Sequence, residues 1–154
     1  MLRKKILVVC ALICCVGLLV GCSEVQNIVG TSKGNTQENI YVTSMNAVTK
    51  TFYDALDGFQ DDVKNKNVDG MKAKVNDVQG VIDSANKLDV PESCKGIQKQ
   101  YIDGFTSLKK CLEDYVQVYS DQKDGKQVDT SAIQKNYDAA INNLKAADKA
   151  IYEL

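Results

Sequence analysis

Residues 39–154 place their apolar side chains three or four positions apart, in four separate stretches. This spacing lines up side chains on one face of an α-helix, whereas a half-buried strand would alternate at every second residue. The pattern therefore predicts four amphipathic helices, over residues 39–66, 68–88, 91–122 and 130–154. The most regular stripe belongs to the fourth stretch and consists of Ile133, Tyr137, Ala140, Leu144, Ala147, Ile151 and Leu154.

Short connections with turn-forming residues separate the four stretches. Asn67 precedes the second predicted helix, where its side chain can accept hydrogen bonds from free backbone amides. Pro91 fits the first turn of the third, where a missing N–H costs nothing. Asp124 and Gly125 predict a turn, and Asp129 follows as the N-cap of the fourth helix. Because short connections make successive helices antiparallel, we predict an all-α fold, an antiparallel up-down-up-down four-helix bundle.

The first 22 residues have a different character. Residues 1–5 are cationic, and residues 6–20 carry no charge. A transmembrane helix needs roughly 20 apolar residues, so this run fits the hydrophobic region of a signal peptide better. The residues that follow it, Leu19, Val20, Gly21 and Cys22, resemble the lipobox of bacterial lipoproteins.

This resemblance implies that residues 1–21 are a lipoprotein signal peptide and that Cys22 becomes the lipidated first residue. Two alternatives remain: lipidation of Cys15, which has a cysteine where a small residue is usual, and an uncleaved anchor helix. Residues 22–38 are rich in Gly, Ser, Thr and Asn and predict a flexible tether to a domain over residues 39–154. We expect a lipid-anchored protein at the cell membrane, facing the extracytoplasmic side.

The composition of residues 22–154 disfavours several classes of function. They carry 16 basic and 20 acidic residues, a balance that lacks the broad basic patch of a nucleic-acid-binding protein. The chain has no His, so the commonest metal ligand and general base is absent, and its only Arg is Arg3. No nucleophile has a visible base beside it. We therefore expect no enzymatic activity and no cofactor.

Cys94 and Cys111 are the other cysteines that follow the signal peptide. Seventeen residues of one helix separate them by about 25 Å, whereas the Cα atoms of a disulfide lie within ~7 Å. We predict buried free thiols; the alternatives are an intermolecular bridge, or a helix that bends back near Gly96 or Gly104.

Carboxylates recur along one face of the first predicted helix, at Asp54, Asp57 and Asp61, between Lys50 and Lys64. We interpret them as a solvated face with ion pairs one helical turn apart. The alternative is a cation site completed by another helix.

Seven tyrosines and no Trp make up most of the aromatic content. Tyrosine in a bundle usually lies at the edge of the core with its hydroxyl in water. The alternative is that Tyr115 and Tyr119 join an aromatic groove for a partner. Gly80 lies inside a predicted helix, where it predicts either close packing or a bend that opens a cavity.

The layout of anchor, tether and bundle resembles that of small helical-bundle lipoproteins of Gram-positive bacteria. We expect a non-enzymatic interaction module with a protein or cell-envelope partner, attached to the membrane through the lipid on Cys22. The alternative is a carrier or sensor that holds a small apolar ligand between the helices. A sizeable internal pocket would favour the carrier, and a filled core would favour the interaction module.

Overall fold

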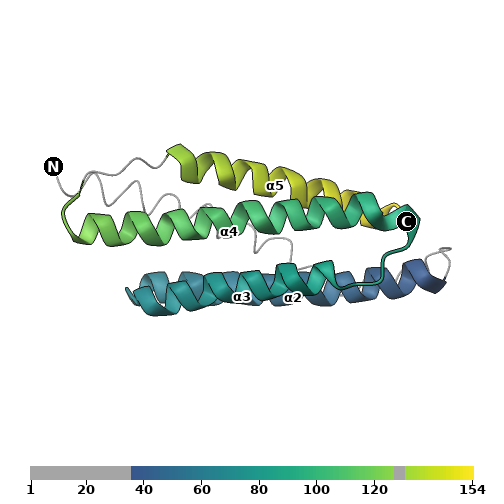
Figure 1. Ribbon diagram of the computed structural model, residues 1–154, viewed down its shortest axis with the longest axis horizontal. Coiled ribbons are helices and arrows are strands. Elements are labelled where there is room, and N and C mark those ends of the chain that lie inside the picture. The colour runs from purple at the N-terminus through teal and green to yellow at the C-terminus, as the bar shows by residue number, and fades with distance from the viewer. Residues whose placement is uncertain (1–35, 127–130) are drawn as a thin grey trace. The chain divides into compact units, whose positions relative to one another are not determined.

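A computed structural model describes residues 36–126 and 131–154, which form helices joined by short turns (Figure 1). The elements are α2 (Thr36–Lys64), α3 (Val68–Asn86), the 3₁₀ helix η2 (Glu92–Cys94), α4 (Lys95–Lys123) and α5 (Ser131–Tyr152). The predicted all-α class with four helices is confirmed, and none of the described residues forms a strand. The predicted signal peptide, the lipobox and the N-cap Asp129 lie outside the described residues.

Helix α2 begins three residues earlier than the sequence predicts, so residues 36–38 belong to the helix and not to the tether. Two interactions of Glu38 stabilise this added turn. Its carboxylate lies in the first turn, where negative charge is stabilising. It also accepts a hydrogen bond of 2.6 Å from Ser93 Oγ, 55 residues away. Thr36, where α2 begins, lies fourteen positions after Cys22.

Helices α2 and α3 form a hairpin. Asn67 is the predicted N-cap of α3, and its side chain accepts a hydrogen bond of 3.1 Å from Gly70 N–H. The side chain of Asn67 also donates to Asp62 Oδ1 at 2.7 Å, which ties the end of α2 to the turn. Further along, the Lys74 side chain lies over Gly58. Helices α2 and α3 therefore run antiparallel and are in contact.

The third predicted helix starts with a 3₁₀ turn. Pro91 precedes η2, and Cys94 N–H donates to Pro91 O at 2.9 Å. Gln98 Nε2 then donates to Ala85 O at 2.8 Å, joining the start of α4 to the end of α3. At the other end of α4, Gly125 adopts a φ of 78°, which forms the turn predicted there.

Aromatic side chains fill the space between α2 and α4. The Phe52 and Phe105 ring centroids lie 4.4 Å apart, and those of Phe59 and Tyr115 lie 5.8 Å apart. On another face of α4, Gly104 lies against Leu144 of α5. Helix α4 therefore packs against α3 and α5, and its aromatic side chains also reach those of α2. This arrangement agrees with the broad apolar stripe in its sequence.

Candidate functional site

Tyr115 and Tyr119, the predicted groove residues, stack on each other with ring centroids 6.4 Å apart. Tyr115 is 6% exposed and packs edge-on against Phe59 of α2. Only Tyr119 keeps part of its surface in solvent. The pair is therefore part of the packing between α2 and α4, and Tyr115 does not line an open groove.

Cys94 and Cys111 are both free and buried, as predicted. Burial raises the pKa of the Cys111 thiol to about 12, with a smaller contribution from Asp114. Burial also raises the pKa of Cys94, although its contact with Ser93 acts in the opposite direction. Because the thiolate is the reactive form, neither residue has the features of a nucleophile.

The acidic face of α2 is solvated, as predicted. Asp54 pairs with Lys50 at 3.1 Å and Asp61 with Lys64 at 2.8 Å, and all four side chains are exposed. In the part of the chain that the structure describes, no group of three or more potential metal ligands comes together.

Gly80 lines a surface groove between α2 and α3. The groove has a volume of about 590 Å³. It opens to solvent, so it is not the internal cavity that the sequence raised as one alternative for Gly80. Its lining consists mainly of small residues, among them Ala47, Val48, Thr51, Ala55, Gly80 and Ser84.

The hydroxyl groups in this groove are already engaged by the backbone. Thr51 Oγ1 donates to Ala47 O at 3.1 Å, and Ser84 Oγ donates to Gly80 O at 2.7 Å. Their methyl and methylene groups therefore contribute to a largely apolar floor. Charged groups stand at the margin, where Lys74 pairs with Asp77 at 2.8 Å.

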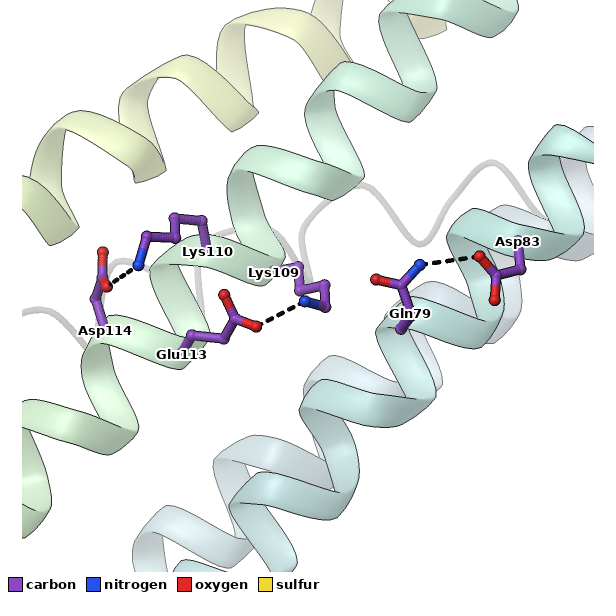
Figure 2. A network of polar contacts seen from close by, with 6 residues as sticks. All are labelled: Gln79, Asp83, Lys109, Lys110, Glu113 and Asp114. Carbon is purple, nitrogen blue, oxygen red and sulfur yellow. Dashed lines mark hydrogen bonds and ion pairs between the residues drawn. The ribbon is translucent and has the colours of Figure 1, made fainter.

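The second region is polar and lies across the middle of α4 (Figure 2). Lys109 Nζ pairs with Glu113 at 2.6 Å, and the Lys109 side chain is only 20% exposed. Figure 2 shows Gln79 of α3 facing this pair. On the other side of α4, Asp114 pairs with Lys110 and accepts a hydrogen bond of 3.1 Å from Asn136 of α5. The two ion pairs lie within α4, and the hydrogen bond from Asn136 to Asp114 links α4 to α5.

A third feature, which no pattern in the sequence indicates, is a hydrogen bond of 2.7 Å from the Tyr101 hydroxyl to Asp148 Oδ1. The two residues are 47 positions apart. Burial raises the pKa of Asp148, while the hydrogen bond from Tyr101 opposes that rise. Burial, together with the neighbouring carboxylate, also raises the pKa of Tyr101. The pair joins α4 to α5 near one end of the bundle.

Of these three regions, only the groove between α2 and α3 offers a concave, largely apolar surface. The polar groups of the other two regions are engaged either in ion pairs within α4 or in hydrogen bonds that join α4 to α5. The groove is therefore the best candidate for a binding site among the described residues.

Comparisons of the chain with protein-family models, with curated proteins and with solved structures found no match. Over residues 36–126 and 131–154, no helix combines the length and the apolar character needed to cross a bilayer.

Proposed function

We propose that this protein is a lipid-anchored, extracytoplasmic interaction module without enzymatic activity, and that its binding face is the groove between α2 and α3. The observation that carries the proposal is the small-residue floor of that groove. Ala47, Thr51, Gly80 and Ser84 let another backbone approach closely. The lipobox resemblance at Cys22 supplies the membrane attachment.

The partner that fits this groove is an α-helix of a membrane or cell-envelope protein. Two adjacent helices leave a furrow between them that can accept the ridge of a third helix. The floor offers few free hydrogen-bonding groups, because Thr51 and Ser84 bond to their own helices. The groove therefore has few groups that could replace the hydrogen bonds between water and a sugar or another strongly polar ligand.

The carrier alternative is less well supported by the packing. An apolar ligand held between helices needs space in the centre of the bundle. There, Tyr41, Phe52, Tyr101 and Phe105 are almost completely buried, and the rings of Phe52, Tyr101 and Phe105 pack on one another. A filled centre favours a function carried out at the surface.

Membrane attachment is tested by changing Cys22 in the full-length chain expressed in a lipoprotein-processing bacterium. We expect mass spectrometry of the N-terminal peptide to find a diacylated Cys22, and Cys22→Ala to leave the precursor unprocessed. Mutation of Cys15 to Ala serves as the control and should change nothing. Normal processing and membrane retention of the Cys22→Ala protein would contradict the anchor.

The groove is tested by a matched pair of substitutions at glycines. A Cβ atom added at Gly80 or at Gly96 meets nothing within 4 Å, so an arginine at either position should leave the fold intact. Gly80→Arg fills the groove, whereas Gly96→Arg lies on the first turn of α4, outside it.

The readout is crosslinking of the lipidated protein in intact cells, with mass spectrometry to identify the crosslinked protein. We expect one envelope protein to be recovered with the unmodified chain and with Gly96→Arg, and to be lost with Gly80→Arg. The proposal fails if Gly80→Arg retains the partner, or if both variants lose it equally.

A further inference from the structure

The large hydrophobic side chains that the described residues leave exposed are Ile40, 61% exposed, and Tyr152, 74% exposed. One such residue on a protein surface is ordinary. These two are notable because of their position, since they lie in the first turns of α2 and at the last residue of α5.

Contacts place both residues at the same end of the bundle. The hydrogen bond between Ser93 and Glu38 holds η2 beside the first turn of α2. Tyr101, two turns into α4, bonds to Asp148, one turn before Tyr152. Figure 1 shows the start of α2 and the C-terminus of the chain at this end. We call it the entry end, defined by Ile40, Leu88, Val90 and Tyr152.

The two ends of the bundle differ in the character of their connections. At the entry end, the connection between α3 and η2 contains Leu88, Val90 and Pro91, each partly exposed. The described connections at the opposite end are polar and exposed throughout, and consist of Asn65, Lys66, Asn67, Asp124, Gly125 and Lys126. Among the described connections, the partly exposed apolar residues therefore lie at the entry end, beside Ile40 and Tyr152.

Charge does not explain this asymmetry. At the entry end Lys95 pairs with Glu92 at 2.6 Å, and Lys149 lies 3.9 Å from Glu153. Paired charges of both signs give little attraction to an anionic surface. Any contact made by this end would depend on its apolar groups.

We propose that the entry end rests on the surface of the lipid bilayer to which Cys22 is attached, with Tyr152 and Ile40 at the boundary between headgroups and acyl chains. This inference rests on the proposed lipid anchor. Thr36 lies fourteen positions after Cys22, a length that spans at most about 50 Å even when fully extended. The anchor therefore keeps this end, where α2 begins, at high local concentration beside the membrane.

The side chains suit that environment. A tyrosine ring is favourable at the interface, where its body contacts apolar groups and its hydroxyl stays hydrated. Ile40 adds purely apolar area that can leave water. In this orientation the bundle axis projects away from the membrane, and the groove between α2 and α3 is accessible to proteins beside it.

The absence of Trp from the chain makes a direct test feasible. We propose single-tryptophan variants of the full lipidated protein, Tyr152→Trp and Ile40→Trp, reconstituted into phosphatidylcholine and phosphatidylglycerol vesicles with or without brominated acyl chains. Tyr119→Trp is the matched control, because it lies in the last turns of α4, about 36 Å along the helix from its start. Circular dichroism checks that each variant is folded.

We expect brominated lipid to reduce the fluorescence of both entry-end variants about twofold, since apolar groups at the interface enter ~5–10 Å into the boundary between headgroups and acyl chains, beside the brominated chains. The fluorescence of Tyr119→Trp should not change. Raising NaCl to about 1 M, where the Debye length falls to ~3 Å, should leave the quenching intact.

Vesicle flotation distinguishes failure of the docking proposal from failure of the lipid anchor. If the protein floats with the vesicles but neither entry-end tryptophan is quenched, docking is overturned and the anchor stands. Equal quenching of all three variants also overturns docking, because it shows no preferred end. If the protein does not float, both the anchor and the docking are overturned.

Discussion

At the scale of single residues, Gly80 and Gly104 have opposite surroundings although both lie inside helices. A Cβ atom at Gly80 meets nothing within 4 Å. At Gly104 it would lie 2.7 Å from the Leu144 side chain and 3.3 Å from the Leu144 backbone nitrogen. The first glycine costs helix stability without a packing benefit, and the second permits α4 and α5 to approach closely.

We therefore expect Gly80→Ala to raise the free energy of unfolding by up to about 1 kcal/mol, because alanine is the better helix former. Gly104→Ala should lower it by about 1–3 kcal/mol, because the added methyl group forces α5 away. Urea denaturation followed by circular dichroism measures both values. Changes of the same sign in the two variants would contradict this assignment.

Asp148 should make stability depend on pH. Its pKa is raised above the ordinary value of 3.8 by burial, so the folded state binds this proton more tightly than the unfolded chain does. The contribution of Asp148 to the free energy of unfolding is therefore greatest below pH 3.8, its ordinary pKa. This contribution is lost as the pH rises through the raised pKa of the folded state. Tyr101, which donates to Asp148, stays neutral over this range because a tyrosine hydroxyl ordinarily titrates far above it, and burial raises its pKa further.

The test compares the wild type with Asp148→Asn between about pH 4 and pH 7, the range over which a raised carboxyl pKa acts. We expect the wild type to lose stability relative to the variant as pH rises. Asp138→Asn, at an exposed position on the same helix, is the control. The same pH dependence in both variants would rule out Asp148 as the cause.

Cys94 and Cys111 should react slowly in the folded protein. Both are buried and both have raised pKa values. In a fragment of residues 36–154, where they are the only thiols, we expect alkylation at least about a hundredfold slower in the native state than in urea. Mass spectrometry follows the labelling. A disulfide between Cys94 and Cys111 would refute the predicted separation of the two thiols.

At the scale of helices, α5 depends on contacts made by one face. Leu144 lies at the centre of its apolar stripe, is buried, and packs on Gly104 of α4. Its neighbour Lys145 is exposed. Substitutions at these two adjacent positions therefore distinguish the effect of buried packing from the effect of helix propensity.

We expect Leu144→Ala to lower the free energy of unfolding by about 2–5 kcal/mol, the usual range for removing a large buried side chain. Lys145→Ala should change it by less than about 0.5 kcal/mol, as for other surface substitutions. Chemical denaturation measures both. Comparable losses in the two variants would mean that this face of α5 is not packed as described.

At the scale of the whole molecule, residues 36–154 should fold without lipid, metal or disulfide. Their described helices bury long apolar stripes and an aromatic centre, and the two cysteines among them are free. We expect a fragment of residues 36–154 to be strongly helical, to unfold cooperatively, and to be unaffected by chelator or reductant. Circular dichroism that showed a disordered fragment until a partner was added would favour folding on binding instead.

Local features of this fold were predictable because they depend on neighbours in the chain. The helical spacing of apolar residues predicted four helices, and the Asn67 cap and the Gly125 turn follow from the chemistry of single side chains. Helix ends were less predictable. Helix α2 starts at Thr36, and its first turn includes Glu38, whose bond to Ser93 is a contact that no local pattern indicates.

The helical class, the solvated carboxylate face of α2 and the burial of both cysteines could be predicted from the sequence, since periodicity indicates which side of a helix meets water. Which buried faces meet depends on tertiary packing. It placed Tyr115 against Phe59, brought Asp148 to Tyr101, and left the groove beside Gly80 uncovered. Those pairings depend on how helices distant in sequence pack, and many packings satisfy the same apolar stripes.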